Sequence, residues 1–315
     1  MILLKNCFAI ESPEVQAGNQ ASERQRWDIL IEGDTISRIA PEIEIPPREG
    51  TPSHKGAPPR TGDPFPREEV EIIDASRLVV LPGFVNTHHH FFQTLTRALP
   101  AAQDAKLFDW LVYHYEIWKY IDVEAVRAST MLAIGELLKT GCTTTTDHHY
   151  LYPHRFDGDL VATQFDAAAR LGIRFAPSRG SMSRSKKDGG LPPDSVVQTD
   201  DEILAHSEEV IGRFHDADSR SMRKIVLAPC SPFSVTRDLM RETAALARRS
   251  GVRLHTHLAE TADEDRYCLE TFGKRPLALM EECDFIGSDV YYAHGIFFTD
   301  EELDLLAQSR TGVSH

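Results

Sequence analysis

Cysteine is scarce in this sequence, and its arrangement excludes two common kinds of site. The five cysteines are odd in number and far apart, and no two of them form a Cys-x-x-Cys pair. Small disulfide scaffolds and thiolate zinc sites need paired or closely spaced cysteines. We therefore expect neither, and because the composition favours a reducing compartment we expect the protein to be cytoplasmic.

Long apolar runs and an excess of positive charge are also missing. No stretch of about 18 apolar residues occurs, and the apolar opening Met1–Leu4 is too short for the core of a signal peptide. The formal net charge of −14 repels phosphate backbones and anionic lipid surfaces. We therefore expect no membrane segment, no secretion signal and no nucleic-acid partner.

Turn and strand signals divide the chain into two parts. Residues 1–40 contain short apolar runs separated by turns, which predict a small β module. Residues 41–70 are rich in proline, glycine and charge, and predict an exposed loop. We expect an N-terminal β-sandwich module over residues 1–78 and a larger domain over residues 79–315.

The larger part alternates between β-branched runs and segments with helical periodicity, which is typical of parallel βα units. Seven strands are predicted: Val79–Val85, Cys142–Thr146, Ile173–Ala176, Ile225–Ala228, Val252–His257, Val290–Ala293 and Thr311–His315. So many consecutive units favour an α/β fold of the (β/α)8 TIM-barrel type over an open sheet. The barrel is expected to be incomplete, ending at about the seventh strand.

Histidines cluster where these predicted strands end. His88 and His90 follow the first strand and share one side of the chain, because side chains alternate along an extended segment. His257 ends the fifth strand with Glu260 in the loop behind it, and His294 ends the sixth. Barrel enzymes place their active sites at this end of the strands, so these histidines predict a catalytic site.

Neutral imidazole is a good ligand for Zn²⁺ or Fe²⁺, and histidines from facing strands can hold three corners of a tetrahedron. A single histidine at a strand end is more often a hydrogen-bonded structural residue. That interpretation is kept for five others: His89, His114, His154, His206 and His215. Asp147–His149 is left open between a structural and a pocket-lining role. Cys230 is expected to be a pocket wall residue, because no dedicated base accompanies it.

Several segments resemble the amidohydrolase superfamily, in its cytosine, guanine and adenosylhomocysteine deaminase branch. The resemblance rests on Pro82–His90, His257–Glu260 and Ala293-His294. More narrowly, the chain is similar to the 8-oxoguanine deaminase and hydroxydechloroatrazine ethylaminohydrolase group in four segments: His88–Pro100, Ala102–Asp104 with Leu107–Leu111, Asp188–Val197, and Leu227–Val235.

The resemblance implies that three histidines ligate one zinc ion per subunit, with Fe²⁺ as the alternative metal: His88, His90 and His257. It implies that Glu260 shuttles protons and that His294 polarises the hydrolytic water or the substrate. Gln93 and Arg97 are the candidates for reading the edge of the substrate. The adenosylhomocysteine deaminases carry a histidine where this chain has Cys230, so the substrate of that branch does not transfer.

The implied function is metal-dependent hydrolytic deamination of a free aminopurine, with 8-oxoguanine converted to urate and ammonia. An s-triazine or aminopyrimidine is the alternative substrate within the same chemistry, and a homo-oligomer is left open. Two other hypotheses stay open, namely a metal-independent binding protein on the same scaffold and an inactive truncated form.

The resemblance also implies an eighth strand that carries a metal-binding aspartate. No candidate for this aspartate follows His315 in the sequence. We therefore expect the chain to be a fragment or a truncated form, with weak metal retention and little turnover on its own.

Overall fold

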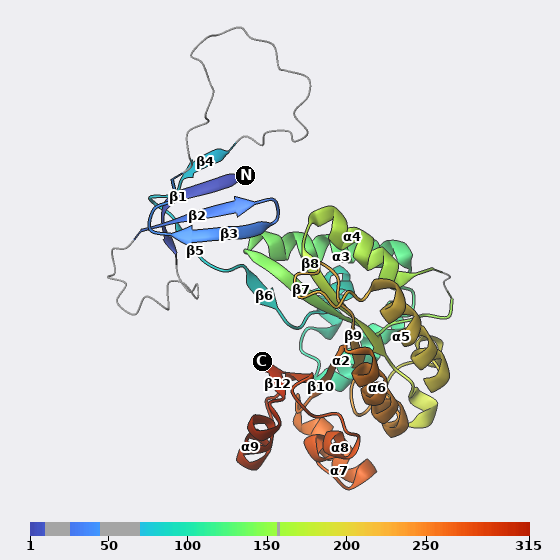
Figure 1. Ribbon diagram of the computed structural model, residues 1–315. Helices are drawn as coiled ribbons and strands as arrows, with labels where there is room; N and C mark the ends of the chain where they lie inside the picture. The colour runs from blue at the N-terminus through green and yellow to red at the C-terminus, as the bar shows by residue number, and fades with distance from the viewer. Residues whose placement is uncertain (10–25, 45–69, 156–157) are drawn as a thin grey trace, which may run out of the picture. The chain divides into compact units, whose positions relative to one another are not determined.

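The computed structural model describes residues 1–9, 26–44, 70–155 and 158–315, which form two compact units, Met1–Gly83 and Phe84–His315 (Figure 1). Most of the predicted loop over residues 41–70 lies outside the described residues. The sequence predicts a domain boundary after residue 78, and this boundary stays a prediction. The two compact units divide a few residues later, with residues 79–83 in the first unit.

The first unit is a β module with five described strands: β1 (Ile2–Ala9), β2 (Trp27–Glu32), β3 (Thr35–Ala40), β4 (Glu71–Asp74) and β5 (Val79–Val80). Their order is β3-β2-β1-β4, and β5 also pairs with β1. The buried Asp28 carboxylate lies 2.8 Å from the Lys5 ammonium and accepts hydrogen bonds from the backbone N–H groups of Asn6 and Ile43. These bonds tie the first two strands to the chain that follows β3.

The second unit is built on seven parallel strands: β6 (Phe84–Asn86), β7 (Cys142–His149), β8 (Arg174–Ser181), β9 (Val226–Pro229), β10 (Arg253–Leu258), β11 (Val290–His294) and β12 (Gly312–Ser314). Each strand pairs with the next one along the chain, in the order β12-β11-β10-β9-β8-β7-β6. This simple progression is that of a TIM barrel. The predicted fold, an incomplete barrel reaching its seventh strand, is confirmed.

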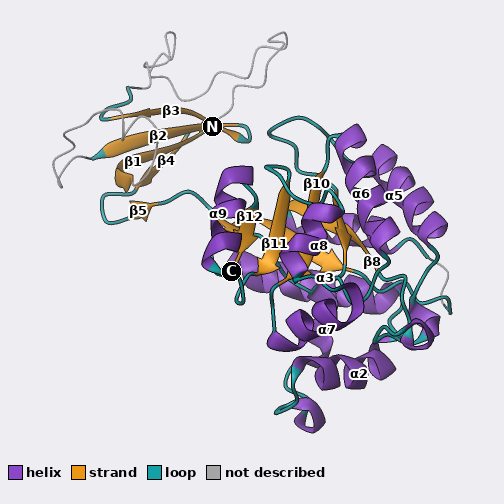
Figure 2. Cartoon of the chain, turned by 90° about the horizontal axis from the view of Figure 1, so that it is seen from below, coloured by secondary structure: helices purple, strands orange, loops and turns teal. Residues whose placement is uncertain are grey.

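Helices surround the strands of this unit (Figure 2). They are α2 (Leu107–Trp118), α3 (Val123–Lys139), α4 (Leu160–Leu171), α5 (Asp200–Phe214), α6 (Arg237–Ser250), α7 (Ala262–Phe272), α8 (Pro276–Glu282) and α9 (Asp300–Ser309). Four of them begin at a threonine whose hydroxyl accepts from the first-turn backbone, which satisfies a free N–H group. Within the described residues, no helix combines the length and apolar character needed to cross a membrane.

The first predicted barrel strand is wrong in its extent. Val79–Val80 pairs with β1 in the first unit, and only Phe84–Asn86 joins the barrel sheet. Pro82 and Gly83 separate the two pieces, because proline has no N–H group for a strand ladder and glycine weakens an extended segment. The apolar run Val79–Val85 is predicted to be a buried strand, and this is also wrong, since β6 is an edge strand and the Phe84 and Val85 side chains are 58% and 63% exposed.

Leu254 on β10 is fully buried in the main core between sheet and helices, whereas Leu303 on α9 is 49% exposed. Leu254→Ala should lower the free energy of unfolding by about 2–5 kcal/mol, because it removes buried apolar surface and leaves a cavity. The matched change Leu303→Ala should cost less than about 1 kcal/mol. Urea unfolding of both variants checks this, and equal losses would contradict the assigned core.

Candidate metal centre and active site

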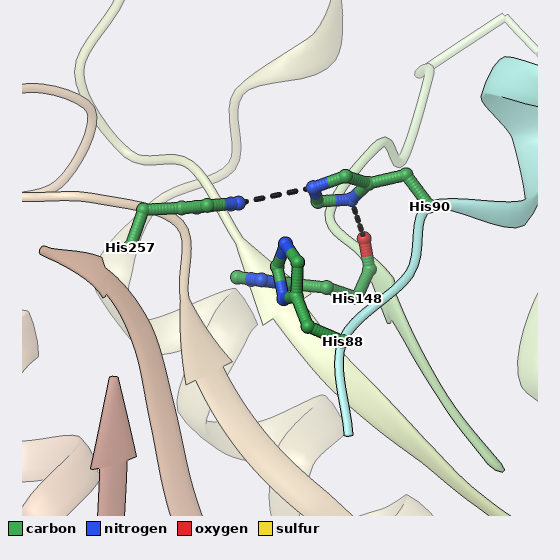
Figure 3. A group of neighbouring side chains, drawn as sticks. All are labelled: His88, His90, His148 and His257. Atoms are coloured by element: carbon green, nitrogen blue, oxygen red, sulfur yellow. Dashed lines mark hydrogen bonds between the residues drawn. The ribbon is translucent and has the colours of Figure 1, made fainter. Parts of the chain in front are cut away.

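Four histidines converge at the carboxyl ends of the barrel strands. His88 and His90 lie in the segment after β6, His148 lies near the end of β7, and His257 lies near the end of β10. Each offers one nitrogen, and these four nitrogens lie within 4.8 Å of one another. Figure 3 shows the side chains pointing toward a common centre. Positions up to 169 residues apart in the chain, His88 and His257, therefore form one cluster.

Backbone carbonyls orient two of these rings. The Nδ1 atom of His90 lies 2.8 Å from the carbonyl oxygen of His148, and that of His257 lies 2.6 Å from the carbonyl oxygen of Cys230. A carbonyl only accepts hydrogen bonds, so Nδ1 carries the proton in both rings and Nε2 carries a lone pair. The two Nε2 atoms face each other at 3.0 Å. Nitrogens on a tetrahedral zinc would be about 3.3 Å apart.

His88 is oriented through a second histidine. The Nδ1 atom of His255 lies 2.8 Å from the carbonyl oxygen of Tyr291, and the Nε2 atom of His255 lies 2.8 Å from Nδ1 of His88. His255 therefore donates to the carbonyl and accepts from His88. This leaves Nε2 of His88 as a buried nitrogen without a hydrogen-bond partner.

In His148 the roles of the two ring nitrogens are reversed. Its Nε2 atom lies 3.1 Å from the carbonyl oxygen of Ala228, and its buried Nδ1 atom has no partner. The lone pairs of His90 and His257 face each other, and His88 and His148 each have a buried nitrogen without a partner. This arrangement is unfavourable unless a cation binds these nitrogens. The donor set therefore fits a divalent metal ion.

Burial keeps these rings neutral, as metal ligation requires. It lowers the pKa of His90 to about 3 and moves the pKa of His88, His148 and His257 well below the ordinary histidine value. The neighbouring imidazoles lower the pKa further, because each added charge would repel the others.

An acid–base pair lies beside the cluster. The Oε1 atom of Glu260 is 3.5 Å from the Nε2 atom of His294, and the His294 ring stacks on His257 with 5.4 Å between ring centroids. Burial raises the pKa of Glu260 to about 7. A carboxyl group with this pKa can both release and take up a proton near neutral pH.

A cavity of about 290 Å³ opens onto these groups. Its polar lining includes His90, Gln93, His257, Glu260 and His294, and its apolar and aromatic lining consists of Leu107, Trp110, Leu111, Tyr115, Tyr150, Cys230 and Phe233. Burial raises the pKa of the Cys230 thiol to about 12. The cysteine is therefore a wall of the cavity and not a thiolate nucleophile.

The structure brings together all but one of the predicted site residues. Arg97 does not line the cavity of the histidine cluster but a neighbouring hollow, and the two share His90, Gln93 and Trp110. Its guanidinium is half exposed and lies 2.5 Å from the Glu136 carboxylate. Gln93 is thus placed to contact a molecule in the cavity, whereas Arg97 would have to leave Glu136 to do so.

Sequence reasoning left His148 undecided and gave His255 no role of its own. His148 follows a predicted strand just as His88 and His90 do, so its position was a usable signal. His255 comes two residues before His257, and alternation put both on one face without saying which would reach the metal. Of the five histidines interpreted as structural, His114 and His154 bond to the backbone carbonyls of Trp110 and Val197, and for the other three the interpretation stays a prediction.

Comparisons with known proteins concern the family and the fold of the chain. The model of the amidohydrolase family matches residues 79–315. An 8-oxoguanine deaminase of Pseudomonas aeruginosa is 48% identical over 77% of this chain and 54% of its own length. A hydroxydechloroatrazine ethylaminohydrolase of Pseudomonas sp. strain ADP is 37% identical over 91% of this chain and 60% of its own. The chain thus spans about half to three fifths of the length of these relatives.

Among solved structures, an amidohydrolase from an environmental sample of the Sargasso Sea is 32% identical, with a TM-score of 0.72 over all of this chain and 63% of its own. An atrazine chlorohydrolase of Arthrobacter aurescens TC1 complexed with zinc has a TM-score of 0.80 over all of this chain and 65% of its own, at 24% identity. The second likeness concerns the fold alone.

His148 and its neighbour His149 allow a matched test of the cluster. Both are buried, but His149 faces away and its Nε2 atom bonds to the carbonyl oxygen of Leu151. His148→Gln should weaken zinc affinity at least about tenfold, whereas His149→Gln should leave it within about threefold. Competition with a chromogenic chelator measures both. Equal losses of zinc affinity in the two variants would show that His148 is not a metal ligand.

The buried histidines also predict how the metal-free protein responds to acid. Of the histidines with a lowered pKa, the six most deeply buried are His88, His90, His148, His149, His255 and His257, and three carboxyl groups have a raised pKa (Asp147, Glu260 and Glu264). Near pH 5 the unfolded chain protonates all six imidazoles, while the folded chain protonates only the three carboxyls. The unfolded state thus binds more protons, and stability falls as pH drops.

We expect the Tm of the chelator-treated protein to fall by at least ~5 °C between pH 7 and pH 5. Differential scanning fluorimetry across this range measures it. A flat profile, or a Tm that rises toward pH 5, would mean that the carboxyl groups outweigh the histidines.

Proposed function

The chain belongs to the amidohydrolase family, and we propose that it forms the catalytic part of a zinc-dependent deaminase acting on a free aminopurine, with 8-oxoguanine as the preferred substrate. The proposal rests above all on the four-histidine cluster beside the Glu260 and His294 pair. The 48% identity to an 8-oxoguanine deaminase supports the choice of substrate.

In this proposal His88, His90 and His257 hold the metal through Nε2, and His148 adds its Nδ1 nitrogen or supports the other rings. When bound, zinc supplies a water molecule that is acidic enough to attack at neutral pH. The backbone carbonyls and His255 keep each ring in the tautomer that ligation needs.

Glu260 moves the protons of the reaction. With a pKa of about 7 it can take a proton from the attacking water and deliver it to the ring nitrogen beside the amine-bearing carbon. The hydroxyl added to the ring carbon then gives up its proton, which Glu260 passes to the amine. The C=O bond forms as the C–N bond breaks, and ammonia leaves. His294 is placed to hydrogen-bond the water or the substrate, since it lies between Glu260 and His257.

The cavity suits a flat, neutral heterocycle. Trp110, Tyr150 and Phe233 offer aromatic surfaces, and the amide of Gln93 offers both a donor and an acceptor for a ring edge. Among the residues that line the cavity there is no lysine or arginine, so a phosphate group would find no cationic partner. A free base therefore fits better than a nucleotide. Arg97 stays a weaker candidate for contacting the substrate.

An s-triazine or aminopyrimidine remains the alternative substrate, because the chain is also 37% identical to a hydroxydechloroatrazine ethylaminohydrolase. The same acid–base pair would serve, with the amine of a different ring as leaving group.

Ammonia release from 8-oxoguanine, guanine, isocytosine and hydroxylated aminotriazines tests the proposal. The zinc-loaded 315-residue chain and a form extended C-terminally by one further βα unit are assayed side by side, with Glu260→Gln as the inactive control. We expect 8-oxoguanine to give the highest kcat/KM, and Glu260→Gln to lower kcat by about 10²–10⁴ with its zinc retained. A higher kcat/KM for a triazine would replace 8-oxoguanine as the assigned substrate. Activity that survives Glu260→Gln would show that Glu260 is not the proton shuttle.

A further inference from the structure

The loop that carries Glu260 is short and conformationally restricted. Only Ala259, Glu260 and Thr261 connect β10 to α7. Ala259 has a φ of 52°, a left-handed conformation that residues with a Cβ atom adopt infrequently. Something outside the loop must therefore hold this backbone in place.

Glu264, in the first turn of α7, makes contacts that do this. Its side chain is 1% exposed, and its two carboxylate oxygens accept hydrogen bonds from the backbone N–H groups of Ala259 at 3.2 Å and Glu260 at 2.8 Å. The carbonyl of Ala259 in turn accepts from the N–H group of Phe297 at 2.9 Å. The peptide before Glu260 is thus fixed from both sides.

These bonds differ from ordinary helix capping elsewhere in the chain. In α5 and α9 a glutamate at the same third position of the helix bonds to the N–H group of the capping threonine itself, as Glu202 does with Thr199. In α7 the cap Thr261 has no such bond from Glu264, whose oxygens reach one and two residues further back, to Glu260 and Ala259. The carboxylate therefore serves the loop and not the helix end.

The helix that carries Glu264 is itself anchored. The next residue, Asp265, lies 2.6 Å from the guanidinium of Arg275, which also lies 2.9 Å from the carboxylate of Glu302 on α9. Because α7 is anchored, the Glu264 carboxylate has a fixed position. Its hydrogen bonds can therefore restrain the loop.

We propose that Glu264 is a positioning residue that holds the Ala259–Glu260 backbone so that the Glu260 carboxyl stays against His294 and the histidine cluster. The inference rests on the proposed function in so far as Glu260 is the proton shuttle. Glu264 is not itself among the residues that line the cavity or form the cluster, and it contacts the lining through the backbone N–H group of Glu260. Its effect on the reaction therefore passes through Glu260.

Glu264→Gln tests directly whether the two Glu264 hydrogen bonds hold the loop. The glutamine oxygen can accept one N–H group, but its NH₂ group faces the other, so one of the two bonds is lost. We expect hydrogen–deuterium exchange of the Ala259 and Glu260 amides, resolved by fragmentation mass spectrometry, to speed up at least about tenfold. Glu202→Gln, at the equivalent position of α5, is the matched control and should leave these two amides unchanged.

Kinetics then show whether the Glu264 hydrogen bonds matter for the reaction. We expect Glu264→Gln to lower kcat by about 10- to 100-fold, with KM within about twofold and zinc affinity within about threefold of the parent. Glu264→Asp keeps the carboxyl group but is too short to reach both amides. It should show the same faster exchange and lower kcat, and it replaces the glutamine variant if that variant folds poorly.

Unchanged amide exchange in both Glu264 variants would overturn the proposal. So would a loss of zinc affinity in step with kcat, since it would make Glu264 a support of the whole strand end. If the extended form without substitutions releases ammonia from none of the substrates, the proposed function fails, while the exchange measurement still decides whether Glu264 holds the loop.

Discussion

The candidate metal centre depends on hydrogen bonds that decide which nitrogen of each buried ring carries the proton. His90 and His257 are fixed by carbonyls, and His88 is fixed through His255. The carbonyls belong to neighbouring barrel strands or their ends, so the spacing of the sheet sets the positions of the rings. The lone pairs therefore point inward because the barrel backbone binds the opposite side of each imidazole.

This arrangement links folding to metal binding. Nitrogens without partners are held together in a buried site, which opposes folding when no cation is present. A metal that binds only the folded chain offsets this cost and raises stability by mass action. The same burial keeps the rings neutral near pH 7, so ligation does not first have to displace protons from them.

Much of this organisation could be predicted from the sequence. Alternation along the chain placed His88 and His90 together, and the regular βα rhythm placed both beside His257. The course of the chain across Pro82 and Gly83 could not be foreseen, because the apolar run Leu78–Val85 reads as one strand until its pairing partners are known. The position of Arg97 also needed the fold, since its pairing with Glu136 joins residues 39 apart. The role of His255 could not be predicted either. Periodicity gives the face of a strand on which a histidine lies, but not whether it binds the metal or a neighbouring ligand.

Cys230 lines the cavity with its side chain, and its carbonyl oxygen, which every amino acid possesses, lies 2.6 Å from Nδ1 of His257. Its sulfur lies farther from that nitrogen, at 3.9 Å. Mutations at this position can therefore reshape the substrate wall while the orientation of His257 is preserved. The cavity wall and the metal-binding histidine can therefore be altered separately here, which makes residue 230 a suitable position for reshaping the cavity.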